Sequence, residues 1–389
     1  MDKLESGKRF WVLTLGSLAV VTLLVGWVVN GYYIERQIAQ SSDRLMLLST
    51  LRREAMARYL DTAEAELRFW SGSQRIHEVQ AYFKARWQEY EATIGDPGAR
   101  LRELYIENNP HQLGQRRELA DAGDGSTYSE LHAELHPIAK LFVTERGYYD
   151  FFLITPEGNI AYTVEKEDDF GTSLMSGPWR DTGLADVYRR AIAGAQDGAA
   201  VFSDLERYGP SSDAPALFMA KATLDDSGEL LGVIAFQLPT DYITEIMHHG
   251  DTMGESGETY LVGRDLLMRS NSRFSEGSTI LETTVDTATV RKALYGEEGV
   301  EFTPDYRGID VLSAYTTLDI GDTQWAVMAE IDREEILARA TSDRPWLAGL
   351  MLLLYGLGAW SVWFVQRSDF DAVQEPVFGD FDGGLDAGD

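Results

Sequence analysis

Two histidines have the spacing that first suggests chemistry in this 389-residue chain. His132 and His136 are four positions apart, so on a helix both imidazoles lie on one face, as they do in zinc hydrolases. The zinc-hydrolase pattern places Glu directly after the first His, whereas Ala133 follows His132 here and Glu134 comes one position later. A dedicated zinc site would also need a third ligand within range. We therefore expect no metal at this helix.

Two acidic segments, 165–169 and 380–386, raise the question of calcium binding. Neither segment fits the twelve-residue loop that has Gly at its sixth position and Glu at its last. Solvated charge or disorder is the simpler interpretation of both. The sequence also contains no phosphate-binding glycine loop, no nucleophile elbow and no kinase signature. It therefore predicts that the protein is not an enzyme and carries no cofactor.

The overall charge is strongly negative. The formal net charge of -29 excludes a nucleic-acid-binding protein, which would need a basic face. An acidic exterior favours solubility and repels anionic surfaces. The chain has no cysteine, so it has neither disulfides nor thiolate metal sites. That absence is compatible with either side of a membrane.

Two uncharged stretches, 10–29 and 345–365, are each long enough to cross a bilayer as a helix. A secretory signal would have a shorter apolar core and a cleavage site of small residues, so we interpret the first stretch as a retained anchor. A buried core helix is the alternative for each stretch. Aromatic residues around both stretches include candidates for the belts found at membrane interfaces: Trp11, Trp27, Tyr32, Tyr33, Trp346, Trp360 and Trp363.

Basic residues near the spans give the expected orientation. Lys3, Lys8 and Arg9 precede the first span, which favours a cytoplasmic N-terminus. Arg339 and Arg344, before the second span, argue weakly the other way. The first helix usually decides, so we expect both chain ends in the cytoplasm and the residues between the spans on the opposite side.

A long helix is expected after the first span, because residues 34–90 contain almost no Gly or Pro. An apolar stripe along it has steps of four and three residues, which is typical of a helix that packs against another helix. The stripe could form the seam of a homodimer or could pack only against its own domain. Its members are Met56, Leu60, Ala63, Leu67 and Trp70.

The hydrophobic period changes from helix to strand near Tyr149, and the same order of elements then occurs twice. Each copy reads as a hairpin, a helix, three strands and an exit helix, which predicts an α+β fold with two tandem antiparallel sheets. The first copy has strands at 149–154, 160–164, 199–204, 216–222 and 230–238, with helices at 184–193 and from 241. The second has strands at 259–263, 266–270, 300–303, 311–318 and 325–331, with helices at 285–294 and 332–342.

Three segments, 147–153, 257–263 and 268–274, carry a family resemblance. They read Gly-Tyr-Tyr-Asp-Phe-Phe-Leu, Gly-Glu-Thr-Tyr-Leu-Val-Gly and Met-Arg-Ser-Asn-Ser-Arg-Phe. With the order of elements, they make residues 34–341 resemble the double Cache sensor domains of bacterial chemoreceptors, sensor kinases and cyclases. The resemblance implies two PAS-like modules on the periplasmic side of a bacterial inner membrane. The expected division is 1–9 (cytoplasmic N-terminus), 10–33 (transmembrane helix), 34–127 (helical stalk), 128–247 (membrane-distal module), 248–343 (membrane-proximal module), 344–366 (transmembrane helix) and 367–389 (acidic cytoplasmic tail).

The resemblance also implies a small-molecule pocket over the sheet of the first module, covered by residues 170–180. Such pockets combine aromatic walls with a few convergent polar groups. For each aromatic residue, ordinary core packing is the competing interpretation. Amino-acid-binding members of the family carry Arg-x-Trp-Tyr in the cover, which residues 177–181 do not reproduce, so the ligand class stays open. The expected walls are Tyr149, Tyr162, Phe170, Trp179, Tyr208 and Phe218, and the expected polar groups are Lys166, Arg180, Asp204 and Lys221.

The function expected by analogy is a sensor, in chemotaxis or a related signalling pathway, that passes a ligand-induced change to its output. Only residues 366–389 follow the second span, and they are too few to fold into a kinase, cyclase or other transmitter. We therefore expect the output to lie on a separate cytoplasmic or membrane signalling protein. The alternative is a non-catalytic accessory subunit of a larger membrane complex, which would bind no ligand.

Overall fold

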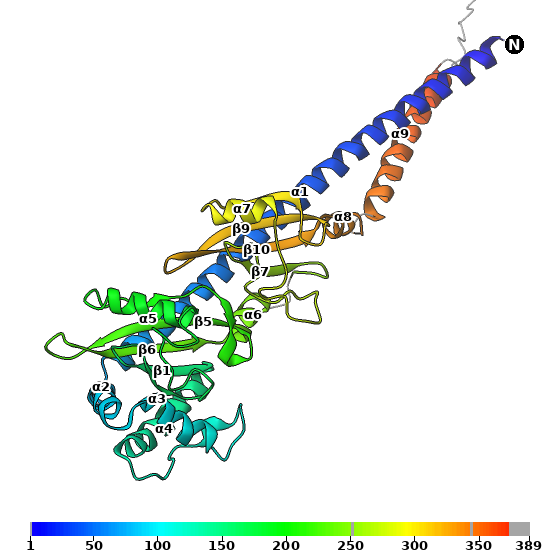
Figure 1. Cartoon of the computed structure of the whole chain (residues 1–389). Helices are drawn as coiled ribbons and strands as arrows, with labels where there is room; N and C mark the ends of the chain where they lie inside the picture. The colour runs from blue at the N-terminus through cyan, green and yellow to red at the C-terminus, as the bar shows by residue number, and fades with distance from the viewer. Residues whose placement is uncertain (1, 250–252, 343–344, 373–389) are drawn as a thin grey trace, which may run out of the picture. The chain divides into compact units, whose positions relative to one another are not determined.

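The computed structural model describes residues 2–249, 253–342 and 345–372 (Figure 1). These residues form two compact units, one made of residues up to 41 with those from 334 onward, and the other of residues 42–333. The helix α1 (Asp2–Ser71) contributes to both units. The sheets and the candidate site all lie in the second unit.

The first unit consists of the start of α1, α8 (Arg333–Ser342) and α9 (Pro345–Ala372). Among the described helices, α1 is long and apolar enough to cross a membrane by length and composition. The apolar part of α9, Ala348–Phe364, is shorter than that criterion requires. The second predicted span therefore remains a prediction.

Within this unit, α1 and α9 contact each other in antiparallel order. A Cβ on Gly26 would lie 2.5 Å from Sδ of Met351, and one on Gly358 would lie 3.4 Å from Cγ of Leu18. The rings of Tyr33 and Trp346 are 6.3 Å apart. Glycine lets the two helices approach closely at these points, as small residues do in membrane helix pairs.

The first sheet is antiparallel and has the strand order β2-β1-β6-β5-β3, with β4 paired to β5. Helix α5 (Gly183–Ala193) covers one face; α1, α2 (Gln74–Ile94) and α4 (Thr127–Arg146) cover the other. We call this sheet with its helices the first module. Its strands are β1 (Asp150–Ile154), β2 (Ile160–Thr163), β3 (Val201–Phe202), β4 (Glu206–Tyr208), β5 (Ala214–Leu224) and β6 (Leu230–Leu238). Short helical segments complete it: α3 (Pro97–Arg102), η1 (Glu103–Glu107), η2 (Arg116–Glu118) and η3 (Gly209–Ser211).

The second sheet is also antiparallel, with the order β7-β10-β9-β8. Helix α6 (Thr240–His248) leads into it, and α7 (Ala288–Leu294) packs on one face. Its first strand pairs with its last, just as β1 pairs with β6 in the first sheet. We call this sheet with α7 the second module. Its strands are β7 (Glu258–Val262), β8 (Gly299–Pro304), β9 (Asp310–Ile320) and β10 (Thr323–Asp332).

The α+β class, the long N-terminal helix and the antiparallel sheets are therefore confirmed. The predicted strand 266–270 is wrong. Leu266 has a φ of +66°, and the segment makes only the isolated bridges of Met268 with Val262 and of Leu267 with Thr284. A positive φ lies outside the extended region, so the chain cannot continue there as a strand.

The apolar stripe of α1 packs inside its own chain. All five of its members are buried in the core that α1 shares with both sheets, so the stripe is not available as a dimer seam: Met56, Leu60, Ala63, Leu67 and Trp70. Packing against its own domain is the correct interpretation of this pattern. A homodimer through α1 would have to use the opposite face, where Leu47, Leu51 and Phe69 are exposed.

Candidate functional site

The aromatic residues predicted to wall one pocket are divided between the two faces of the first sheet. Tyr162 and Phe170 belong to the core on the α1 and α4 side. Tyr208 and Phe218 belong to the core under α5. Side chains of a strand alternate between faces, which the sequence pattern alone did not resolve because both faces are apolar.

Under α5, the structure brings three of the predicted residues together. The rings of Trp179 and Tyr208 are 6.5 Å apart, and those of Tyr208 and Phe218 are 4.8 Å apart. Tyr208 and Phe218 are fully buried, and Trp179 is partly exposed beside them. This arrangement is an aromatic wall at one end of the sheet.

A buried acidic cluster adjoins this wall, and we define it as Glu167, Asp169, Tyr208, Ser211 and Gln237. The hydroxyl of Tyr208 donates to Oδ2 of Asp169 at 2.6 Å, and that of Ser211 donates to Oε2 of Glu167 at 2.6 Å. Nε2 of Gln237 donates to the Ser211 hydroxyl at 3.3 Å. The predicted residue Tyr149 reaches this acidic cluster from its rim, because its hydroxyl donates to Oε1 of Glu167 at 2.6 Å.

Two acceptor atoms in the acidic cluster have no donor among the described residues. They are Oδ1 of Asp169 and Oε1 of Gln237, on side chains that are 1% and 2% exposed. Burial raises the pKa of Asp169 to about 7, and it also raises the pKa of Glu167. Buried acceptors without a donor are costly, so the acidic cluster is suited to a ligand group that donates hydrogen bonds. An ammonium or hydroxyl group fits this chemistry.

The predicted residue Lys166 points away from the acidic cluster. Its φ of +54° turns the chain between Glu165 and Glu167, and its Nζ lies 3.3 Å from Nε2 of His136 and 3.3 Å from the carbonyl of Val164. Burial lowers the pKa of Lys166 to about 7. The amine of Lys166 is therefore held on the α4 side, away from Asp169.

His132 and His136 are stacked in the core, with ring centroids 4.7 Å apart. Nε2 of His136 lies 2.7 Å from the carbonyl of Arg117, and Nδ1 lies 2.8 Å from the hydroxyl of Tyr162. Burial lowers the pKa of both histidines, to about 3 for His136. Among residues 2–249, 253–342 and 345–372, no three His, Cys, Asp or Glu side chains form a group that could hold a metal ion. The pair is a neutral, hydrogen-bonded part of the core.

The other predicted polar residues lie outside the acidic cluster. Arg180 is exposed and its Nε lies 3.5 Å from Oδ2 of Asp181. Nζ of Lys221 donates to the carbonyl of Gly198. Asp204 lines a surface pocket of about 330 Å³ together with Asp181, Asp186 and Glu206, among others. Whether any of the predicted residues contacts a ligand stays a prediction.

Asp204 also joins the two modules. Its Oδ1 accepts from Nε1 of Trp325 at 2.8 Å and from Nε of Arg269 at 3.1 Å, and its Oδ2 accepts from Arg269 at 2.9 Å. Arg269 and Trp325 are fully buried in the second module. The sequence could not pair these residues, because 65 and 121 positions separate them from Asp204.

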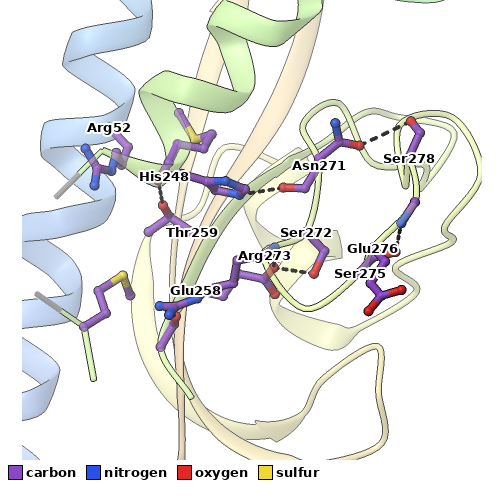
Figure 2. Close-up of a pocket in the computed structure, with 14 residues that line it drawn as sticks. Arg52, His248, Glu258, Thr259, Asn271, Ser272, Arg273, Ser275, Glu276 and Ser278 are labelled. Carbon is purple, nitrogen blue, oxygen red and sulfur yellow. Dashed lines mark hydrogen bonds between the residues drawn. The ribbon is translucent and has the colours of Figure 1, made fainter. Parts of the chain in front are cut away.

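A second candidate site is a cleft of about 600 Å³ in the second module (Figure 2). It lies between α1, which contributes Arg52, the end of α6, which contributes His248, the start of β7 and the loop 271–278. Its volume falls in the range of small-molecule pockets. The residues of this cleft come from positions 52 to 278 and belong to no single motif, so the sequence did not predict it.

Comparisons with solved structures find sensor domains of low sequence identity. The ligand-binding domain of Campylobacter jejuni chemoreceptor Tlp3, in complex with 4-methylisoleucine, is 11% identical; the match covers 80% of this chain and 95% of that one, with a TM-score of 0.44. A domain of a putative sensory box/GGDEF family protein from Vibrio parahaemolyticus is 8% identical, with 77% and 99% covered and a TM-score of 0.48. The ligand-binding domain of Pseudomonas aeruginosa amino acid chemoreceptor PctC, in complex with GABA, is 15% identical, with 64% and 98% covered and a TM-score of 0.37.

A comparison with curated proteins finds no match. The model of the Cache domain family matches residues 34–340, which include all strands of both described sheets. Because this match spans most of the chain, the protein belongs to the Cache domain family.

Proposed function

We propose that this protein is a membrane-anchored extracytoplasmic sensor that binds a small molecule in its first module and transmits a conformational change to a separate signalling protein. The observation that carries the proposal is the acidic cluster, where Asp169 and Gln237 keep two buried acceptor atoms without a donor. Membership of the Cache domain family supports a sensor role. No catalytic constellation is required for this function.

The ligand should carry an ammonium or a comparable hydrogen-bond donor. Such a group would supply the donors that Asp169 and Gln237 lack and would compensate the buried negative charge. Trp179, Tyr208 and Phe218 would form the apolar wall against the rest of the ligand. Tyr149 would close the rim through its hydrogen bond to Glu167.

The path of transmission would run through Asp204 into the second module. Asp204 follows β3 of the first sheet and bonds to Arg269 and Trp325 of the second module. Strand β10, which contains Trp325, leads directly into α8 and then α9. A coupling of about 1 to 3 kcal/mol would be enough to bias a two-state output.

The test is thermal unfolding of the full chain in mild detergent with a panel of primary amines and amino acids, each paired with its N-acetylated counterpart. We expect at least one amine to raise Tm by several degrees and its acetylated counterpart to have no effect. Asp169→Asn should weaken that affinity by roughly 10- to 100-fold, as expected for a lost charge-assisted hydrogen bond. Asp168→Asn, at the exposed neighbouring position, is the matched control.

The accessory-subunit alternative gives a different result in the same preparation. An accessory subunit should show no ligand-dependent shift and should co-purify with its complex at fixed stoichiometry. A panel in which no amine changes Tm, or in which Asp169→Asn leaves the shift unchanged, would refute ligand binding at the acidic cluster.

A further inference from the structure

The cleft in the second module is built from segments that are far apart in the sequence. Figure 2 shows Arg52 on α1, His248 at the end of α6, Glu258 and Thr259 at the start of β7, and the loop that carries Asn271 to Ser278. Its volume of about 600 Å³ is large enough for a metabolite of moderate size. Polar side chains and backbone dominate its lining.

Two arginines line this cleft, Arg52 and Arg273, and Arg52 keeps a buried Nε without a partner. Its guanidinium donates to the carbonyl of His249, beyond the end of α6. Its Nε is buried and has no acceptor, and none of the described carboxylates lies within ion-pair distance. The neighbouring Arg53 differs, because it bonds to Thr316 and approaches Glu298 to 4.0 Å. A guanidinium presents five donors, so most of the capacity of Arg52 is unused.

The buried acid of the cleft is already satisfied. Oε1 of Glu258 accepts from the hydroxyl of Ser272 at 2.5 Å and from the backbone N–H of Arg273 at 2.8 Å. Its Oε2 accepts from the hydroxyl of Tyr306 at 2.8 Å. Glu258 is therefore held on the wall and does not neutralise Arg52.

Three further polar residues add donors, whereas Glu276 brings an exposed carboxylate to the rim of the cleft. Nε2 of His248 lies 2.8 Å from the carbonyl of Asn271, so this nitrogen carries the proton and donates. Oδ1 of Asn271 accepts from the backbone N–H of Thr279 at 2.9 Å and from the hydroxyl of Ser278 at 3.2 Å, which orients its amide nitrogen away from those contacts. Ser275 accepts from the backbone of Gly277 and keeps its own hydroxyl proton for another acceptor.

We propose that this cleft is a second ligand site, which binds a small anion with a carboxylate or phosphate group against Arg52. The anion supplies the acceptor that Nε of Arg52 lacks, and the amide of Asn271 and the hydroxyl of Ser275 contact its polar remainder. Guanidinium groups bind carboxylate and phosphate through paired hydrogen bonds, which gives both strength and orientation. This site differs in position and in ligand charge from the acidic cluster of the first module.

An anion in this cleft would act on the helix that leads toward the predicted first span. It would bridge Arg52 of α1 to the loop 271–278 and to the end of α6, the helix that connects the two sheets. The second module would then bind a second ligand of the sensor, and an anion in its cleft would hold α1 against the second sheet. A ligand that contacts both α1 and the second module stabilises the conformation in which the cleft is formed.

The test uses the full chain in detergent at low salt, with acetate, succinate, citrate, inorganic phosphate and glycerol phosphate as probes. Succinamide and glycerol serve as uncharged counterparts. We expect at least one anion to raise Tm by several degrees and neither neutral counterpart to do so. Arg52→Gln should weaken the binding of that anion by roughly 10- to 100-fold. Arg58→Gln, an exposed arginine on the same helix paired with Glu54, should leave it unchanged.

A second variant separates loss of the site from loss of the fold. A Cβ on Gly277 would have open space around it, so Gly277→Trp can place a ring over the cleft without a backbone clash. It should abolish the anion-induced shift and leave unfolding without ligand unchanged. A panel in which no anion raises Tm, or an anion shift that persists in Arg52→Gln and in Gly277→Trp, would overturn the proposal. Neither result bears on the amine test of the acidic cluster.

Discussion

In each module, one of the buried carboxyl groups that accept from a tyrosine hydroxyl has a pKa raised to about 7. Asp169 accepts from Tyr208 at 2.6 Å in the first module, and Glu330 accepts from Tyr260 at 2.8 Å in the second. Burial raises the pKa of each group to about 7. Both groups therefore change charge near neutral pH, where most carboxyl groups are already ionised.

These two groups predict how stability depends on pH. A carboxyl group with a raised folded-state pKa holds its proton more tightly when folded, so the free energy of unfolding falls as pH rises from the unfolded-state pKa, near 4, to about 7. Between pH 5 and 6.5 the expected loss is roughly 2 kcal/mol for each group. Asp169→Asn and Glu330→Gln each introduce a side chain that stays neutral. Each should reduce the dependence of the free energy of unfolding on pH, as measured by urea unfolding.

The matched control for both substitutions is Asp226→Asn, at an exposed turn position outside either core. It should leave the pH dependence of unfolding unchanged. Equal slopes in the wild type and in both neutral variants would contradict the assignment of raised pKa values to Asp169 and Glu330.

At the level of single residues, the sequence pointed to individual side chains but did not predict which residues they contact. The ligand role of Asp204 stays a prediction, and its bonds to Arg269 and Trp325 of the other module were not predicted. The acidic segment 165–169 was interpreted as solvated charge, yet Asp169 is 1% exposed. The partners of Asp204 and the burial of Asp169 both depend on contacts between segments that are distant in the sequence. Composition and spacing do not predict such contacts.

At the level of elements, one carboxylate links the segment after β3 to Trp325 of β10 and to Arg269. Asp204 lies just after β3, and it is the hydrogen-bond acceptor for Trp325 of β10. Arg269 has a second carboxylate, Asp265, at 3.0 Å, so its charge is not left unpaired when Asp204 is removed. Removal of the Asp204 side chain should therefore weaken mainly the coupling between the two modules.

A double-mutant cycle measures this coupling. Asp204→Ala and Trp325→Phe should each destabilise the protein by about 1 to 2 kcal/mol in urea unfolding, as expected for a lost side-chain hydrogen bond. Because they remove the same bond, their combined effect should be smaller than the sum by about 1 kcal/mol. Glu206→Ala paired with Trp325→Phe is the control, and its effects should add. Additive effects for Asp204 and Trp325 would show that this bond does not couple the modules.

Helices and strands were predicted correctly where the local hydrophobic pattern allowed one interpretation. The prediction for 230–238 coincides with β6, because a continuous apolar run bounded by turn residues is typical of a buried strand. The stripe from Met56 to Trp70 was correctly periodic, but periodicity cannot name the partner surface. Residues 266–270 failed as a strand because the positive φ of Leu266 comes from the local turn and not from residue type.

At the level of the whole molecule, the main open prediction is that two helices cross the membrane as an antiparallel pair. The described part of α1 meets the length and composition expected of a span, whereas α9 contributes the shorter apolar stretch Ala348–Phe364. The contacts of Gly26 with Met351 and of Gly358 with Leu18 give a specific helix register. That register can be tested without reference to the sheets.

The chain has no cysteine, so a pair of introduced cysteines has no competing thiol within the chain. Leu18→Cys with Gly358→Cys should form a disulfide on oxidation in membranes, because a Cβ at position 358 lies 3.4 Å from Cγ of Leu18. A protease site in the exposed turn at Ser227 lets a non-reducing gel show whether the two fragments stay linked. Val12→Cys with Leu352→Cys should stay unlinked, since antiparallel register separates them by about 20 Å along the axis. Fragments of the first pair that separate after oxidation would contradict the antiparallel hairpin.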